Sequence, residues 1–245
     1  MKVSVVTVSY NCEEEIKKTI ESVLAQDNVS IEYWIIDGVS TDRTLSVAES
    51  YRDQMLEKGI EYHLISEKDN GIYEAMNKGA RLATGDVIGF LNCGDYYEKG
   101  TLKTVVKTFG DTGCDLMFGA IRILRQDGSF FVKKGKLRKY QTSRDWNHPT
   151  TFVKTELLKE NPFLNKGIHD DYGFYLKMVS QGRKIVVLDQ VLANFCLGGI
   201  SNKKSLAMAK KRIMDRYRYC YRMNGYGRRY LVECVAMEII KFFIA

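Results

Sequence analysis

The first half of the chain alternates short apolar runs with amphipathic segments. Residues 3–9 form an apolar-rich strand candidate. In residues 13–26, Ile16, Ile20, Val23 and Leu24 recur at the spacing of one helical face. The same alternation predicts further strands at 33–37, 62–66 and 87–92, and helices at 40–52 and 72–85. Strands that alternate with helices of this length predict a parallel sheet built from βαβ units.

The pattern changes in the second half. Short strands are predicted at 116–118, 121–125, 130–133, 151–153 and 184–188, and a helix at 170–181. Asp127-Gly128 lies between two of these strands and indicates a hairpin turn. Residues 134–144 are basic and weakly patterned, which favours a loop. We expect one domain with two functional halves.

Length and composition support this interpretation. The 245 residues are 45% hydrophobic, enough for one sizeable α/β core. The first apolar run is interrupted by Ser4 and Thr7, so it predicts a buried strand and not a secretory signal or a spanning helix. The six cysteines form no CxxC pair, which argues against a zinc site. We expect them to be reduced thiols.

The positive charge belongs to the end of the chain. The whole sequence has 37 Lys and Arg against 30 Asp and Glu, a net charge of +7. Residues 203–245 have 11 against 3, or +8, which leaves 26 minus 27, or −1, for residues 1–202. A nearly neutral main part argues against nucleic acid as a partner.

One run carries most of the chemical information. Residues 66–95 read SEKDNGIYEAMNKGARLATGDVIGFLNCGD, an acidic turn, a helix rich in small residues, and a strand that ends at Asn92-Cys93-Gly94-Asp95. In open α/β sheets, ligands bind beyond the carboxyl ends of the strands. This run resembles the central signature of family 2 glycosyltransferases of the kind found in bacterial surface-polysaccharide biosynthesis. VSVVTVSYN, IIDGVSTDRT and DDYGFYLKM resemble three further motifs of that family in the same order, so the resemblance covers about residues 2–202.

The resemblance implies an α/β architecture with the GT-A fold, a Rossmann-like mixed central sheet flanked by helices. Residues 1–202 would be the catalytic domain, with 1–95 as the nucleotide-binding half and 96–202 as the acceptor half. Residues 203–245 would be a helical, basic and amphipathic extension. The implied reaction is inverting, non-processive sugar transfer from a nucleotide-sugar donor, by analogy a UDP-sugar, to a hydroxyl of a glycan or lipid-linked acceptor.

The resemblance also implies a set of nucleotide-binding residues. They follow predicted strands or lie on the helix at 72–85: Tyr10, Asn11, Asp37, Asp69, Lys78 and Arg81. The alternatives are structural, because Asn11 and Asp69 suit helix capping and turns. Asp37 is the remaining candidate in its motif, since Gly38 stands where many members have a second Asp.

Asp95 is the metal candidate. A Mn²⁺ or Mg²⁺ ion that bridges two phosphates takes hard oxygen ligands and often only one or two protein carboxylates. The family motif usually carries two acids, and Gly94 stands in place of one of them. The alternative is a strand-end Asp in a turn.

Asp170-Asp171 opens a predicted helix and is the candidate catalytic pair. Inverting transfer needs a carboxylate that takes the proton of the acceptor hydroxyl. Two adjacent acids at a helix start lie on different faces, so one can reach the crevice while the other caps the helix. The resemblance assigns the base to Asp171. It also places His148 on the acceptor or diphosphate side, and suggests that residues 198–202 form a loop that closes over the donor.

The C-terminal extension has two interpretations. A basic segment with amphipathic helices can bind an anionic membrane surface, which would place the protein in the cytoplasm at the inner face of the plasma membrane. Alternatively, the helices pack on the catalytic domain or on a second copy in a homodimer.

The sequence also bears on three other functions. Gly38 and Gly94 support a degenerate protein that binds a nucleotide-sugar or acts as a membrane scaffold. A nucleotidyltransferase would need a Gly- and Arg-rich loop after the first strand, and a dehydrogenase a G-x-G-x-x-G there, and neither is found. The Gln-x-x-Arg-Trp motif of processive synthases is absent after Asp171, with only a near match at 141–146.

Overall fold

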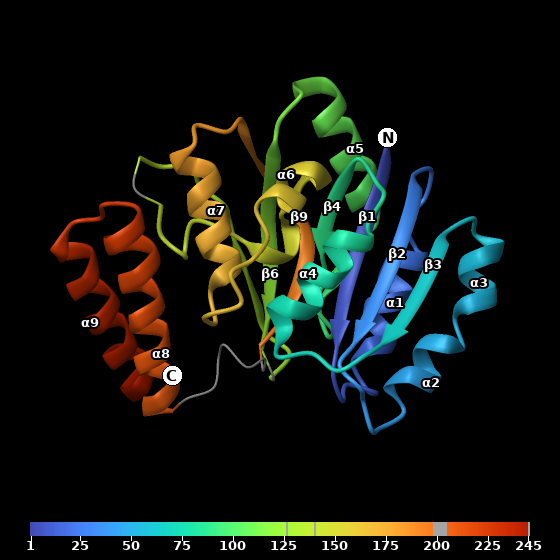
Figure 1. The fold of residues 1–245 in the computed structure, drawn as a ribbon, viewed down its shortest axis with the longest axis horizontal. Helices are drawn as coiled ribbons and strands as arrows, with labels where there is room; N and C mark the ends of the chain where they lie inside the picture. The colour runs from blue at the N-terminus through green and yellow to red at the C-terminus, as the bar shows by residue number, and fades with distance from the viewer. Residues whose placement is uncertain (126, 140, 198–204, 245) are drawn as a thin grey trace.

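The computed structural model describes residues 1–125, 127–139, 141–197 and 205–244. A mixed sheet with the strand order β3-β2-β1-β4-β8-β6-β9-β5 forms the centre of the molecule, and β7 pairs with β6 outside this path. Figure 1 shows the sheet between helices, with the C-terminal helices at one end of the molecule.

The first half of the sheet is parallel, as the alternating pattern predicts. Its strands and helices follow in the order β1 (Lys2–Ser9), α1 (Ile16–Leu24), β2 (Ser30–Asp37), α2 (Thr44–Glu49), α3 (Arg52–Glu57), β3 (Glu61–Ser66), α4 (Ile72–Leu82) and β4 (Val87–Phe90). β1 pairs in parallel with both β2 and β4, and β2 pairs in parallel with β3. The carboxyl ends of these four strands therefore meet at one edge of the sheet.

The second half adds antiparallel strands and more helices. Its elements are β5 (Tyr96–Tyr97), α5 (Thr101–Thr112), β6 (Leu116–Leu124), β7 (Phe130–Lys133), the 3₁₀ helix η1 (His148–Thr150), β8 (Phe152–Lys154), α6 (Thr155–Glu160), α7 (Asp170–Ser180) and β9 (Ile185–Cys196). β8 is antiparallel to both β4 and β6, so β6 runs in the same direction as β4. The carboxyl end of β6 thus reaches the same edge of the sheet as those of β1–β4.

The structure differs from the predicted elements in several places. The helix expected at 40–52 is two short helices, α2 and α3. The two strands expected between 116 and 125 are one strand, β6, whose register with β9 shifts between Phe118 and Ile121. Helices α5 and α6 were not predicted, because their apolar positions are few and lie among Thr and Lys.

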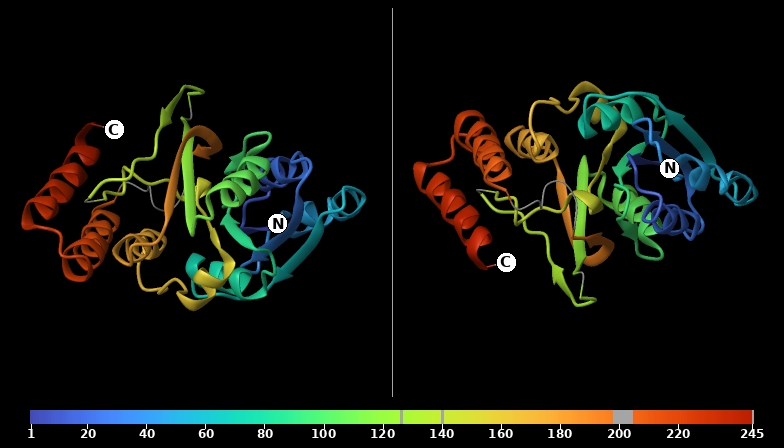
Figure 2. Two further views of the ribbon diagram at one scale, coloured as in Figure 1. Left: turned by 90° about the horizontal axis from the view of Figure 1, so that it is seen from above. Right: turned by 90° about the horizontal axis from the view of Figure 1, so that it is seen from below.

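Two hydrophobic clusters cover the two faces of the sheet (Figure 2). One packs α1, α2, α3 and α5 against the strands. The other packs α4, α6 and α7, and it also contains Tyr219, Cys220 and Tyr226 from the C-terminal extension. The extension therefore shares a core with the catalytic part of the chain.

The extension consists of α8 (Leu206–Arg216), the π-helical segment η3 (Tyr217–Met223) and α9 (Arg228–Ile244). Arg212 and Arg216 of α8 each donate to Glu238 of α9, at 2.8 and 2.9 Å, and all three side chains are buried. Part of the positive charge that the sequence shows in this region is thus neutralised inside the helix pair. Among the described residues, every helix is too short or too polar to cross a bilayer.

The expectation of reduced thiols is wrong for two cysteines, because Cys12 and Cys93 form a disulfide with Cα atoms 6.8 Å apart. Cys12 lies after β1 and Cys93 lies after β4, and these two strands are neighbours in the sheet. The separation of 81 residues in the sequence concealed this proximity. Cys114, Cys196, Cys220 and Cys234 are free, as expected.

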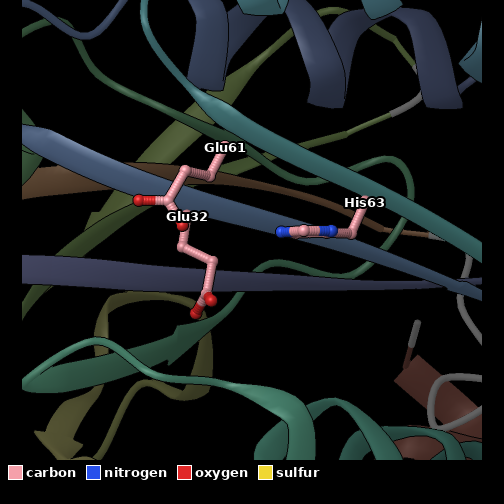
Figure 3. A group of neighbouring side chains, drawn as sticks. All are labelled: Glu32, Glu61 and His63. Atoms are coloured by element: carbon pink, nitrogen blue, oxygen red, sulfur yellow. The ribbon is translucent and has the colours of Figure 1, made fainter.

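Three side chains that could hold a cation lie at the opposite edge of the sheet from the carboxyl ends of β1–β4. Figure 3 shows Glu32 on β2 with Glu61 and His63 on β3. The ammonium of Lys2 lies 2.6 Å from Glu61 and 3.8 Å from Glu32 and supplies the positive charge there. We therefore assign this group a structural role.

Glu32 ties three segments together at that edge. Its carboxylate accepts hydrogen bonds from Ser4 Oγ at 2.5 Å, from Thr84 Oγ1 at 2.8 Å and from the Thr84 backbone N–H at 2.8 Å. Burial alone would raise the pKa of Glu32, but the bonds from Ser4 and Thr84 outweigh it, so the pKa is lowered.

We predict that Glu32→Ala lowers the free energy of unfolding by about 3 kcal/mol, because it leaves buried donors of Ser4 and Thr84 without an acceptor. Chemical denaturation checks this value. The matched control is Glu61→Ala, which removes an exposed carboxylate and should cost less than about 1 kcal/mol. Equal losses in the two variants would contradict this role of Glu32.

Candidate functional site

The carboxyl ends of β1, β2 and β3 are held together by Asp37. Its carboxylate is buried and accepts from Ser9 Oγ (3.0 Å), Ser40 Oγ (2.5 Å), the Ser40 N–H (2.8 Å) and Ser66 Oγ (2.8 Å). A carboxylate offers about four acceptor sites, and these four donors fill them. In this conformation Asp37 holds the carboxyl ends of the three strands together. A direct contact of Asp37 with a nucleotide stays a prediction.

Tyr10 and Asp69 come together above Gly38. A Cβ atom added at Gly38 would lie 2.9 Å from Asp69 Oδ2 and 3.5 Å from the Tyr10 ring. The Tyr10 side chain is 66% exposed, so one face of an aromatic ring and a carboxylate oxygen are available side by side. A second Asp at position 38 would crowd the Asp69 carboxylate and require it to shift.

The adjacent loop has an unusual backbone. Val39 has φ +64° and Asn11 has φ +46°, both in the left-handed region. A β-branched residue such as Val39 strongly avoids this region. Asn11 holds the loop through its Oδ1, which accepts from the Thr41 N–H at 2.8 Å. Backbone strain of this kind is commonly kept at ligand-binding sites.

The two predicted cations on α4 have different surroundings. Lys78 is half-buried, and its ammonium lies 2.9 Å from Glu67 of the turn that precedes the helix. Arg81 is exposed in the last turn of α4. Their contacts with a diphosphate stay predictions.

Asp95 is a buried carboxylate with few partners. Only 4% of the residue is exposed, and its Oδ1 accepts from the backbone N–H of Cys196 at 3.2 Å. Burial raises the pKa of Asp95 to about 7, although the Cys196 N–H and the field of His148 oppose this shift. A bound cation would offset the burial penalty directly.

A second oxygen lies on the same loop. Asn92 Oδ1 is buried and has no hydrogen-bond partner among the described residues. Gly94, between the two, has φ +95°, a conformation that a second Asp at that position would not readily adopt. Carboxylate and amide oxygens are the hard ligands that Mn²⁺ and Mg²⁺ prefer, so Asp95, with one backbone donor, and the unpartnered Asn92 Oδ1 fit such an ion.

Asp171, unlike Asp95, has several hydrogen-bond partners. Its Oδ1 accepts from the hydroxyl of Tyr73 at 2.8 Å and from the Tyr172 N–H at 2.8 Å, and its Oδ2 lies 3.0 Å from Nδ1 of His148. Burial alone would raise the pKa of Asp171, but the charges of His148 and His169 and the hydrogen bonds from His148 and Tyr73 lower it overall. The carboxylate is therefore ionised at neutral pH.

Asp170 points elsewhere. Its Oδ2 accepts from the N–H groups of Lys166 (2.5 Å) and Gly167 (3.2 Å), and its Oδ1 accepts from the hydroxyl of Tyr219 in the C-terminal extension. These contacts fix the start of α7, as expected for the capping member of the pair, and they leave Asp171 as the acid that faces Tyr73 and His148.

The C-terminal extension also binds the residues that precede α7. Asp215 of α8 accepts from the N–H groups of Ile168 (2.6 Å) and His169 (3.2 Å), just before α7 begins.

Four residues that support the site were not predicted from the sequence: Tyr73, Asn92, Asp215 and Tyr219. Tyr73 and Asn92 lie within the informative run at 66–95, whereas no sequence signal links Asp215 or Tyr219 to Asp170. The predicted loop at 198–202 lies outside the described residues.

The sequence and the fold were then compared with known proteins. The family described as "Glycosyl transferase family 2" matches residues 4–173. The chain is similar to the "Putative teichuronic acid biosynthesis glycosyltransferase TuaG" of Bacillus subtilis, 31% identical over 128 residues, which are 52% of this chain and 49% of that protein. The chain thus matches only about half the length of this relative.

Two solved structures share the fold. Residues covering 99% of this chain superimpose on 73% of S. aureus TarS 1-349 in complex with UDP-GlcNAc, with a TM-score of 0.62 and 21% identity. Mannosyltransferase PcManGT from Pyrobaculum calidifontis, in complex with GDP-Man and Mn²⁺, gives a TM-score of 0.64 at 18% identity over 99% of this chain and 70% of that one. The predicted α/β architecture with the GT-A fold is confirmed.

We predict that Tyr219→Phe lowers kcat while it leaves the KM for the donor unchanged, because the lost bond to Asp170 loosens the start of α7 beside Asp171. The matched control is Tyr62→Phe, which removes an equally buried tyrosine hydroxyl from its bond to the Ala48 carbonyl on another part of the sheet. Each variant should lose about 1 kcal/mol of stability. A fall in kcat of the same size in both variants would contradict a positioning role for Tyr219.

We also predict that Asp95→Asn stabilises the metal-free protein more at pH 8 than at pH 5. The folded pKa of Asp95, about 7, lies above its ordinary value, so the folded state binds a proton that the unfolded state has lost. The native protein therefore loses stability as the pH rises from about 4 through 7, and the Asn variant does not. Denaturation curves across this range, with chelator present, test the prediction, and a pH-independent difference would contradict it.

Proposed function

The chain belongs to glycosyl transferase family 2, and we propose that it transfers single sugars, with inversion, from a nucleotide-sugar donor to an acceptor hydroxyl. The contrast between two carboxylates at one end of the sheet carries this proposal. Asp95 is buried with a single backbone donor and has a raised pKa, whereas Asp171 has several hydrogen-bond partners and is ionised. Carboxylates whose environments separate their pKa values in this way commonly have different roles in one reaction.

Asp171 is the proposed base. As the acceptor oxygen forms its bond to the anomeric carbon of the donor, the bond from that carbon to the diphosphate oxygen breaks, and the hydroxyl proton passes to the Asp171 carboxylate. Tyr73 and His148 hold the two carboxylate oxygens in place before this step. One displacement without a covalent intermediate inverts the configuration at the anomeric carbon.

The donor is proposed to bind across the ends of β1–β4. Tyr10 and Asp69 would contact the nucleoside, while Lys78 and Arg81 lie on the helix that follows and would approach the diphosphate. A UDP-sugar is the proposed donor, supported by the complex of TarS with UDP-GlcNAc; the GDP-Man complex of PcManGT makes a GDP-sugar the alternative.

Asp95 and Asn92 are proposed to hold Mn²⁺ or Mg²⁺, and the Mn²⁺ in the PcManGT complex supports this choice. When bound, the ion would neutralise charge on the departing diphosphate. The degenerate alternative rested on Gly38 and Gly94. Both glycines have a structural reason, the close approach of Asp69 in one case and a positive φ in the other, so neither supports a loss of function.

The acceptor is proposed to be a surface glycan or its lipid-linked precursor. The names of two relatives support this: TuaG is a teichuronic acid biosynthesis glycosyltransferase, and TarS of Staphylococcus aureus is a "Poly(ribitol-phosphate) beta-N-acetylglucosaminyltransferase". A lipid-linked acceptor would place the enzyme in the cytoplasm at the inner face of the plasma membrane. For the basic extension, contact with that membrane and packing on a second copy in a homodimer are the two alternatives that the sequence motivates.

We predict that Asp171→Asn lowers kcat for transfer by about 10²–10⁴-fold, because the amide cannot accept the proton, while donor binding stays within about twofold. Release of nucleoside diphosphate from a panel of UDP- and GDP-sugars, with Mn²⁺ and an acceptor hydroxyl, measures transfer. Calorimetric titration with the nucleoside diphosphate measures binding.

Asp170→Asn is the matched control, since it alters the neighbouring carboxylate of the same helix. It should cost stability and leave more activity than Asp171→Asn. Full activity in Asp171→Asn would show that another group is the base. A protein that binds nucleotide but releases none from any donor would support the degenerate alternative.

A further inference from the structure

A hairpin of the molecule exposes apolar and basic side chains together. β7 and the residues after it, with the end of β6, make up residues 122–125 and 127–139, which we call the basic hairpin. Its exposed apolar side chains are Phe130 (58%), Phe131 (42%), Val132 (45%) and Leu137 (53%). In both views of Figure 2 the hairpin projects from the body of the molecule. Large apolar side chains gathered on one projection indicate an interaction surface.

The charge of this segment is as unusual as its apolar content. Residues 122–139 contain seven Lys and Arg against one Asp, a net charge of +6. Because residues 1–202 sum to −1, the rest of that part carries −7. The catalytic part is thus strongly polarised, which orients a molecule toward a negatively charged surface.

The surroundings of the two rings indicate the kind of partner. The Arg122 guanidinium lies over Phe130, 5.2 Å from the ring centroid, and Arg125 lies over Phe131 at 4.9 Å. One face of each ring is therefore covered by a cation, which disfavours stacking against a sugar. Rings beside guanidinium groups suit the boundary between acyl chains and anionic headgroups, where aromatic side chains insert and cations pair with phosphates.

The hairpin lies next to the candidate site. Leu124, next to the turn of the hairpin, pairs with Cys196 in the sheet, and the backbone N–H of Cys196 donates to Asp95. β6 also ends at the same edge of the sheet as the strands that carry Asp37 and Asn92. A surface bound by the hairpin would therefore face the crevice in which the donor is proposed to bind.

We propose that the basic hairpin docks the protein on an anionic lipid surface, with Phe130, Phe131 and Val132 inserted at the level of the headgroups. The C-terminal extension is a weaker candidate for this contact, since Arg212 and Arg216 are buried against Glu238. The docking itself does not depend on the transfer reaction. Its benefit, that a lipid-linked acceptor reaches the site without leaving the bilayer, rests on the proposed function.

Co-sedimentation of the full chain with vesicles tests the proposal. The wild type should bind phosphatidylcholine vesicles that contain phosphatidylglycerol, and bind pure phosphatidylcholine at least tenfold more weakly, since each Lys or Arg near an anionic surface contributes about fivefold in affinity. The double variant Phe130→Ser/Phe131→Ser and the double variant Lys134→Ser/Lys136→Ser should each lose at least tenfold in affinity for the anionic vesicles.

Two controls match these changes. Leu56→Ser removes an apolar side chain of equal exposure (57%) from α3, which lies at the end of the molecule opposite the C-terminal helices (Figure 1). Lys210→Ser/Lys211→Ser removes two exposed cations from the C-terminal extension. Both controls should bind the anionic vesicles within about twofold of the wild type.

Three results would overturn the proposal: equal binding to the two kinds of vesicle, unchanged binding of both hairpin variants, or a loss that appears only in the Lys210/Lys211 variant. Release of nucleoside diphosphate with a water-soluble acceptor, measured without vesicles, separates this test from the proposed function. Hairpin variants that lose vesicle binding should keep that activity, because their side chains lie outside the proposed donor and base residues.

Discussion

The contact of Asp171 with Tyr73 and His148 is what joins the two halves of the fold into one site. Tyr73 comes from α4 of the parallel half, whereas His148 and Asp171 come from the later, mixed half. The field of His148 also reaches Asp95, so one imidazole lies between the two carboxylates. Because these groups are buried, each depends on its partners being in place, and a small displacement of α7 would alter the environment of both acids.

The C-terminal extension belongs to this arrangement. Asp215 and Tyr219 hold the chain just before and at the start of α7. Their bonds enter a core in which aromatic side chains of α7 and η3 pack together, and a Cβ at Gly173 would lie 2.6 Å from the Tyr219 ring. The extension therefore helps to fix the position of α7, which carries the proposed base Asp171. The division of the chain into a catalytic domain and an extension at residue 202 stays a prediction.

The sequence predicted the parallel half well, because its apolar runs and helical faces are local patterns. The family resemblance singled out Asp95, His148 and the pair Asp170-Asp171, and of these the structure brings His148 and Asp171 into direct contact. The sequence could not predict contacts that join distant segments. The bond of Tyr219 to Asp170, the pairing of Cys12 with Cys93 and the four donors around Asp37 depend on three-dimensional packing. Asp37 shows the limit most clearly, because its neighbours Ser9, Ser40 and Ser66 come from three separate segments.

The central claim is that one end of the sheet holds two carboxylates in opposite states, and their titration tests it most directly. Carboxyl ¹³C NMR of the metal-free protein, with Asp95→Asn and Asp171→Asn used for assignment, would follow each group. We expect Asp95 to titrate near pH 7 and Asp171 to titrate below the ordinary range of an aspartate. Added Mg²⁺ should abolish the titration of Asp95 near pH 7. Two carboxyls that both titrate near the ordinary value, with no response to Mg²⁺, would contradict the account.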